Sequence, residues 1–148
     1  MFDAITQQGV TGRAVKNGLI NEQVWSILKD KKGQEWFGTN EGISIFKNGQ
    51  LVKSYSEGKW LTDDDVRYIK EDNNGNIWIG TWNGGVLSYN SVSDRFEMNF
   101  IINSNMNQLL ITALNVDQSN NLWVGTTDGL VYYEIDNKKL RCNKRGFY

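Results

Sequence analysis

Three consecutive segments of this 148-residue chain repeat one pattern, and this internal repetition restricts the fold more than any other feature. The segments run from Val24 to Phe46, from Val66 to Tyr89 and from Ile111 to Tyr133. Each contains an Asp, a Trp six residues later and a Gly-Thr pair that begins two residues after the Trp. Corresponding Asp residues lie 42 and then 45 residues apart, and the Trp residues keep the same intervals. So many matched offsets indicate one structural unit that occurs three times.

The residues that define the repeat have structural explanations, so we interpret them as scaffold. The Asp can accept backbone N–H bonds across a turn, and the Gly three residues later suits a positive φ; Asn120 replaces this Gly in the third unit. We expect the Trp to fill the space between neighbouring units and the next Gly to allow their close approach. The scaffold residues are Asp30, Gly33, Trp36, Gly38, Thr39, Asp72, Gly75, Trp78, Gly80, Thr81, Asp117, Trp123, Gly125 and Thr126.

Each unit consists of short β-rich runs separated by turn residues. The predicted strands are 24–29, 34–39, 43–46 and 50–55, then 66–71, 76–81, 86–89 and 95–100, then 111–116, 121–126, 130–134 and 140–142. A repeat of about 40–45 residues with four antiparallel strands is typical of a β-propeller blade. The predicted fold is therefore all-β, a partial propeller over 1–148. Its blades are expected at about 19–60, 61–105 and 106–148, with 1–18 completing a blade.

Three blades are too few for a ring, since propellers close with about 4–8 blades. An open arc leaves two blade faces uncovered, which favours association. We expect the chain to pair with itself, as a homodimer or higher oligomer. The simplest closed solution is two chains in head-to-tail contact around a two-fold axis, which gives six blades.

Composition excludes several classes of function. The chain has no His, so a Ser-His-Asp triad, a Cys-His pair and a His-containing metal site are all impossible. A single cysteine, Cys142, excludes an intrachain disulfide. Sixteen basic and seventeen acidic residues give a net charge of −1, so we expect no nucleic-acid partner. No apolar run is long enough for a membrane helix, and residues 1–10 lack a signal-peptide pattern.

Two acidic segments offer oxygen ligands for calcium, Asp63-Asp64-Asp65 and the turn that begins at Asp72. Neither has the alternating oxygen ligands and terminal Glu of an EF-hand loop. A solvated loop and a tight turn explain them better. We therefore expect no metal and no cofactor.

The pattern D-x-x-G-x-x-W-x-G-T-x-x-G, preceded by Gly18-Leu19-Ile20-Asn21, resembles the two-component regulator propeller repeat. The preceding element recurs more weakly at Leu61 and only as Met106 in the third unit. Asn120 and one inserted residue in Trp82-Asn83-Gly84-Gly85 depart from the pattern. The resemblance implies the periplasmic sensor region of a bacterial hybrid two-component system, many of which respond to oligosaccharides. It implies a non-catalytic part of the sensing half, since no kinase element is present.

Residues that break the repeat in loops are better binding candidates than residues that make it. The turns between second and third strands and the connections between blades are expected at one end of the propeller. Trp82 replaces Asn40 and Thr127 of the other units, so its indole is the leading candidate for stacking on a sugar ring. The complete set of candidate ligand-binding residues is Trp82, Asn83, Trp60, Asp63, Asp64, Arg67, Glu41 and Asp128.

Structural explanations compete with these assignments. Each Trp can simply pack on an adjacent loop and close the rim. Arg67, which matches Trp25 in position, can meet a uronate or sulfate, but a surface ion pair with a nearby carboxylate is the simpler explanation.

Two other functions stay open at this point. One is an interaction scaffold that binds protein on its rim. The other is a propeller lyase or glycosidase that uses two carboxylates from Glu41, Asp63–Asp65 and Asp128.

Overall fold

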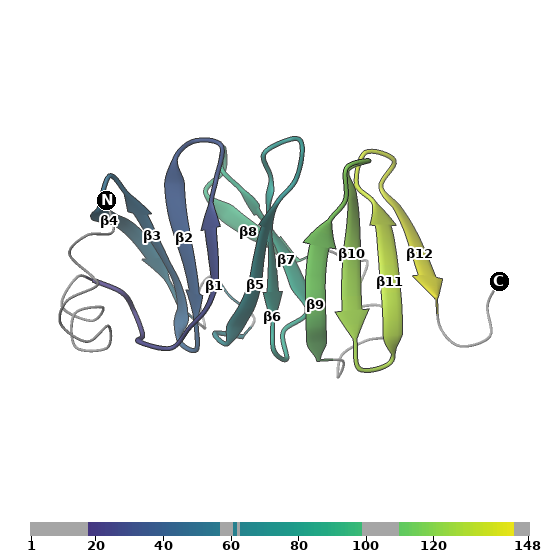
Figure 1. Ribbon diagram of the computed structural model, residues 1–148, viewed down its shortest axis with the longest axis horizontal. Coiled ribbons are helices and arrows are strands. Elements are labelled where there is room, and N and C mark those ends of the chain that lie inside the picture. Colours follow the sequence, from purple (N-terminus) through teal and green to yellow (C-terminus); the bar gives the residue numbers. More distant parts are fainter. Residues whose placement is uncertain (1–17, 57–60, 62, 99–109, 144–148) are drawn as a thin grey trace.

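The computed structural model describes residues 18–56, 61, 63–98 and 110–143, and the structural statements below concern these residues (Figure 1). They form three four-stranded sheets, each of which is one blade. Among them, no helix is long and apolar enough to cross a membrane. The predicted outer strand from residues 1–18 and the predicted blade limits near 60 and 105 lie outside the described residues.

Each blade is an antiparallel meander whose strands pair in chain order. Innermost strands β1, β5 and β9 contact one another in sequence, so the blades stand side by side in an arc (Figure 1). The strands are β1 (Val24–Lys29), β2 (Gln34–Thr39), β3 (Gly42–Lys47), β4 (Gln50–Tyr55), β5 (Val66–Glu71), β6 (Ile77–Thr81), β7 (Val86–Asn90), β8 (Arg95–Met98), β9 (Ile111–Val116), β10 (Asn121–Thr126), β11 (Gly129–Glu134) and β12 (Lys139–Asn143).

The predicted all-β blades are confirmed, and the differences from the predicted strands are confined to their ends. Strand β6 begins at Ile77 and not at residue 76; Asn76 belongs to the turn, where its backbone and side-chain amides bond to Asp72. Strand β3 is longer than predicted, since Gly42 still pairs with Thr39 and Lys47 with Gln34. Strands β7, β11 and β12 are also longer than predicted by one or two residues. Strand β8 is described only to Met98, and the predicted 99–100 lie outside the described residues.

The turn that precedes each second strand is built by the repeated Asp. Asp30 Oδ1 accepts the backbone N–H groups of Lys32 at 2.9 Å and Gln34 at 2.8 Å. Gly33 has a φ of 76° and Asn120 a φ of 61° in these turns, which confirms the predicted left-handed position. The Asp residues also make a contact that was not predicted: Oδ2 of Asp30 accepts the indole N–H of Trp36 at 2.9 Å.

The blades pack through the repeated Trp and Gly, as predicted. Trp36 of the first blade meets Tyr89 of the second with ring centroids 5.1 Å apart, and Trp78 meets Tyr133 of the third at 6.0 Å. At Gly38 a Cβ would stand 2.8 Å from Val66 Cγ1 on the next blade. Because no side chain fits there, this glycine permits the close approach of the two sheets.

A polar network joins β4 of the first blade to β7 and to the turn before β8 of the second blade. Asp94 Oδ1 accepts hydrogen bonds from the hydroxyls of Tyr55 and Tyr89, each at 2.6 Å, and Asp94 Oδ2 pairs with Lys53 Nζ at 2.5 Å. The hydrogen bond from Lys53, followed by those from the two tyrosines, lowers the pKa of Asp94. Burial, followed by the bond to Asp94, raises the pKa of both tyrosines, so they stay protonated donors at neutral pH.

The two ends of the arc expose positions that are buried between blades. On the first blade Ile27 is 64% exposed, whereas Ile69 in the matching position of the second blade is 1% exposed. On the third blade Leu130 is 40% exposed, whereas the matching Val86 is 1% exposed. Trp123 is only partly buried and stacks on Tyr132 of its own blade, with no further blade among the described residues to cover it.

Candidate functional site

Four predicted residues come together where the inner strands begin, beside the turn between the second and third strands of the second blade. These are Asp63, Arg67, Trp82 and Asn83, and they are joined by Asp65 and by Trp25 of the first blade. We call Trp25, Asp63, Asp65, Arg67, Trp82 and Asn83 the rim cluster. Antiparallel order puts this end opposite the Asp-containing turns.

Arg67 is the centre of the rim cluster. Its guanidinium carbon lies 3.9 Å from the centroid of the Trp25 ring and 4.8 Å from that of the Trp82 ring. Trp25 and Arg67 are both the second residue of an innermost strand, β1 and β5, and these two strands contact each other. A guanidinium at these distances is held by cation–π attraction to both indoles. The matching position in two blades therefore places one aromatic ring and one cation in contact.

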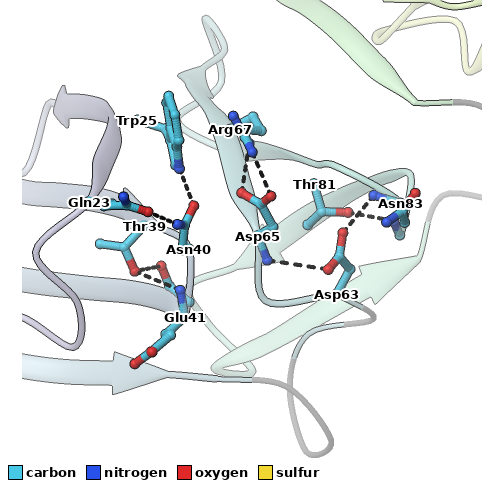
Figure 2. A network of polar contacts seen from close by, with 12 residues as sticks. Gln23, Trp25, Thr39, Asn40, Glu41, Asp63, Asp65, Arg67, Thr81 and Asn83 are labelled. Carbon is cyan, nitrogen blue, oxygen red and sulfur yellow. Dashed lines mark hydrogen bonds and ion pairs between the residues drawn. The ribbon is translucent and has the colours of Figure 1, made fainter.

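Asp65 fixes the orientation of the guanidinium. Arg67 Nε donates to Asp65 Oδ1 at 2.6 Å, and the adjacent terminal nitrogen donates to Asp65 Oδ2 at 2.7 Å (Figure 2). Two parallel charge-assisted bonds of this kind restrict rotation of both side chains. The simpler prediction for Arg67, an ion pair with a neighbouring carboxylate, is confirmed.

Asp63 joins the connection between the blades to the turn that follows β6. Its Oδ2 accepts the backbone N–H of Asn83 at 2.6 Å, and its Oδ1 accepts that of Asp65 at 3.3 Å. The backbone N–H of Trp82 donates to the carbonyl of Asp65 at 2.8 Å. These bonds hold the inserted turn against the inner strand, and the Trp82 side chain stays 36% exposed.

The first blade contributes an amide chain to the same rim. The indole Nε1 of Trp25 donates to Asn40 Oδ1, and Asn40 Nδ2 donates to Gln23 Oε1 (Figure 2). The Trp25 ring is thereby fixed at its edge while the side chain remains 49% exposed. Glu41 donates its backbone N–H to Thr39 Oγ1 at 3.2 Å, and its carboxylate points away from Asp63 and Asp65 (Figure 2).

The remaining candidates are not part of this arrangement. No hydrogen bond or ion pair among the described residues links the side chains of Asp64, Glu41 or Asp128 to the rim cluster. Asp128 lies in the turn of the third blade, where its backbone N–H donates to Thr126 Oγ1 at 3.2 Å. Trp60 lies outside the described residues. In the parts of the chain that the structure covers, no group of three or more acidic or thiol side chains is placed to hold a metal ion.

Sequence reasoning missed how closely Trp25, Asp65 and Arg67 act together. It identified the shared position of Trp25 and Arg67, but it did not pair Arg67 with Asp65 two residues earlier. The signal was present, because alternate residues of a strand point to the same face.

Comparisons with known proteins support the assignment of these sheets as propeller blades. A sequence profile described as two component regulator propeller matches residues 18–41 and 61–83. The extracellular domain of a hybrid two component system from B. thetaiotaomicron superposes with a TM-score of 0.76 and 25% identity, over 88% of this chain and 19% of that one. A second such domain from the same organism gives a TM-score of 0.71 at 22% identity, over 86% of this chain and 19% of that chain.

Other relatives share less with the chain. Virginiamycin B lyase from Staphylococcus aureus superposes with a TM-score of 0.60 at 14% identity, over 80% of this chain and 40% of the lyase, which is a likeness of fold. The tRNA (guanine-N(1)-)-methyltransferase of Pectobacterium carotovorum is 77% identical over 26 residues, 18% of this chain and 10% of that enzyme. The same enzyme of Pseudoalteromonas translucida is 73% identical over 75 residues, 47% of this chain and 29% of that enzyme.

The chain thus spans less than a third of these methyltransferases and about a fifth of the extracellular sensor domains. The superposition on the sensor domains, by contrast, takes in most of the chain. The profile matches cover the start of the first two blades, and the third blade repeats the same Asp, Trp and Gly-Thr positions. Residues 18–41 and 61–83 are therefore similar to the two component regulator propeller repeat, and the blades have the fold of the matched extracellular sensor domains.

Proposed function

We propose that this chain is part of the ligand-sensing propeller of a bacterial two-component regulator, and that the rim cluster contacts the ligand. One observation carries the proposal: Arg67 is held by Asp65 between two indoles that remain 36% and 49% exposed. Partly exposed aromatic rings with fixed polar neighbours are the usual elements of a sugar-binding surface, because ring C–H groups stack on the indole and hydroxyls bond to the polar groups.

The charges of the rim cluster favour a neutral oligosaccharide. Asp65 already neutralises Arg67 through two hydrogen bonds, so the guanidinium has little attraction left for an anion. Asp63 adds a second carboxylate to the same rim. A uronate or sulfate would therefore meet a net negative surface, whereas neutral hydroxyls find carboxylate oxygens and the amides of Asn83 and Asn40.

The compartment follows from the same proposal. The sensor domains from B. thetaiotaomicron are extracellular. We place this chain outside the cytoplasm, in the periplasm, where an oligosaccharide signal would be met.

Self-association is part of the proposal. The free face of the third blade carries Trp123 and Leu130 in the positions that Trp36 and Ile43 occupy at the first interface. The free face of the first blade carries Ile27 where Ile69 is buried. A second copy in head-to-tail contact would cover both with the residues that already join blades.

A catalytic role has weaker support. One superposed structure is a virginiamycin B lyase in which replacement of a histidine gives a variant described as catalytically inactive, and this chain has no histidine. Asp63 and Asp65, the carboxylates nearest the exposed indoles, are hydrogen-bonded to backbone N–H groups and to Arg67. The methyltransferase activity is not transferred, because the chain spans at most 29% of those enzymes.

The test is a thermal-shift panel of neutral and acidic oligosaccharides on the whole chain, repeated with Trp82→Ala. Val92→Ala is the control, since Val92 is 96% exposed on the opposite end of the blade. We expect at least one neutral oligosaccharide to raise Tm, the shift to vanish in Trp82→Ala and to persist in Val92→Ala. A shift with acidic glycans alone would contradict the charge argument. No shift with any glycan, together with capture of a protein ligand that Trp82→Ala abolishes, would favour an interaction scaffold.

A further inference from the structure

A pocket of about 390 Å³ opens between the second and third blades, at the end opposite the rim cluster. Its lining includes Trp78, Ser88 and Glu97 of the second blade and Tyr133 and Lys138 of the third. The volume lies within the range of about 300–1,000 Å³ typical of small-molecule sites. At the corresponding place between the first and second blades, Ile45 and Tyr55 are buried and Lys53 reaches Asp94, and comparison of the two interfaces shows what differs.

One difference between the repeats removes side-chain volume beside the pocket. In the first blade Ile45 pairs with Trp36 on β2 and with Lys53 on β4, and its side chain is only 2% exposed. In the second blade Ser88 takes this position, between Trp78 and Glu97. A hydroxymethyl group replaces a four-carbon side chain, so the space beside Trp78 is not filled.

The two charged residues at the opening of the pocket also have opposite signs from their counterparts at the first interface. Lys53 closes the first interface through its 2.5 Å contact with Asp94, a residue of φ 53° that directly precedes β8. The positions equivalent to Lys53 and Asp94 are Glu97 and Lys138, and Lys138 has a φ of 51° directly before β12. Opposite charges are therefore retained with their signs reversed.

The exchanged pair is not joined. Neither the Glu97 carboxylate nor the Lys138 ammonium makes a hydrogen bond or ion pair with a described residue, although both line the pocket. Asp136, the other carboxylate of the lining, accepts the side-chain amides of Asn74 at 2.9 Å and Asn120 at 2.8 Å. Two opposite charges without a partner among the described residues thus line a pocket that Trp78 and Tyr133 also line.

We propose that this pocket binds a small zwitterion, a free α-amino acid with an apolar side chain. Its ammonium group would pair with Glu97 and its carboxylate with Lys138, and its side chain would lie against Trp78 and Ile135. Asn74 and Asn76 supply further amide donors and acceptors at the mouth. The site is separate from the rim cluster and takes a ligand of a different class from the proposed oligosaccharide.

The test is isothermal titration of the whole chain with single amino acids, each compared with its N-acetyl amide, which keeps the side chain and loses both charges. We expect saturable binding of at least one apolar amino acid and at least tenfold weaker binding of the capped form. Glu97→Gln and Lys138→Met should each weaken binding at least tenfold. Lys139→Met, one residue away on β12, is the matched control and should leave it unchanged.

Ser88→Ile supplies an independent readout, because it places in the second blade the side chain that Ile45 provides at the matching position of the first blade. We expect this variant to unfold at the same or a higher temperature and to bind no amino acid. Binding that survives Ser88→Ile, or equal binding of free and capped forms, would overturn the proposal. It would also be overturned if no amino acid binds. Glu97→Gln and Lys138→Met that then lower Tm no further together than singly would show that the two charges pair with each other, as Lys53 and Asp94 do.

Discussion

The indole Nε1 of Trp78 donates a 2.9 Å hydrogen bond to Oδ2 of Asp72, six residues earlier in the chain. The same bond joins Trp36 to Asp30 at 2.9 Å and Trp123 to Asp117 at 2.8 Å. One carboxylate therefore closes the turn with Oδ1 and orients the inter-blade ring with Oδ2. The constant six-residue spacing between Asp and Trp is explained by this shared acceptor.

Asp72→Ala should be strongly destabilising, because Asp72 is 1% exposed and accepts hydrogen bonds from Asn74, Asn76 and Trp78. Loss of a buried charged acceptor of this kind costs about 2–4 kcal/mol of unfolding free energy. Asp117→Ala makes the matched comparison and should cost less, since Asp117 is only partly buried and its Trp123 faces no further blade in the part of the chain that the structure describes. Urea unfolding followed by tryptophan fluorescence measures both. Equal losses would contradict the assigned role of inter-blade packing.

Gly38→Ala should lower stability by about 1–3 kcal/mol, because the new methyl group would stand 2.8 Å from Val66 Cγ1 and 3.0 Å from the Val66 carbonyl oxygen on the next blade. Gly125→Ala is the control at the same repeat position. There no atom of another blade lies near the new methyl group, and the nearest atom, Thr112 Oγ1 at 3.0 Å, belongs to a side chain that can rotate, so we expect a smaller loss. Urea midpoints compare the two variants. A greater loss for Gly125→Ala would be inconsistent with the glycine serving blade contact.

Asp94→Asn should change the response of the protein to acid. The hydrogen bonds from Lys53, Tyr55 and Tyr89 lower the pKa of Asp94 in the folded state. The stabilisation is therefore complete above the ordinary carboxyl pKa of about 3.9 and is lost as the pH falls from there through the folded-state value.

Because Asp94 is about half exposed, we expect the wild type to exceed Asp94→Asn by only about 1–4 °C in Tm at pH 7. This difference in Tm should narrow between pH 4 and pH 2. Thermal unfolding by circular dichroism at pH 7, 4 and 2 measures it. A difference in Tm between wild type and Asp94→Asn that widens in acid would contradict the lowered pKa of Asp94.

Leu130→Lys should keep the chain monomeric. Leu130 is 40% exposed on the free face of the third blade, and a charge there cannot be buried against a second copy. We expect the unsubstituted chain to have twice the monomer mass by light scattering on a size-exclusion column. Val92→Lys, on an outer turn, should leave that mass unchanged. A monomeric unsubstituted chain at about 100 μM would contradict the proposed head-to-tail pairing.

The fold could be predicted from the sequence in most detail because it depends on short-range chemistry. Turn residues, alternating strands and the Asp–Trp spacing all lie within one repeat. The contacts between blades then use the same repeat positions at each interface. Most strand ends that differ extend by one or two residues because pairing continues into residues expected in turns, as in the Gly42–Thr39 and Lys139–Glu134 pairs. Strand pairing and blade order needed no information beyond the repeat.

The site was less predictable because it depends on contacts between repeats. Trp82 and Asp63 were found because they depart from the pattern, but the position of Arg67 between Trp25 and Trp82 follows from the distance between neighbouring inner strands. The pocket beside Ser88 depends likewise on the next blade and on a charge exchange that is visible only after the strands are paired. Glu41 and Asp128 were placed at the correct end, but nothing in the spacing shows that the Glu41 carboxylate turns away (Figure 2).

The proposal that the rim cluster binds a neutral oligosaccharide is tested most directly by the indole N–H signals of the ¹⁵N-labelled chain during titration with the glycan that gives the largest thermal shift. We predict that the Trp25 and Trp82 signals move together and saturate. The signals of Trp36, Trp78 and Trp123, whose N–H groups are bonded to Asp residues, should stay in place. Movement at Trp78 without movement at Trp25 and Trp82 would place the glycan elsewhere and contradict the assignment of the rim cluster.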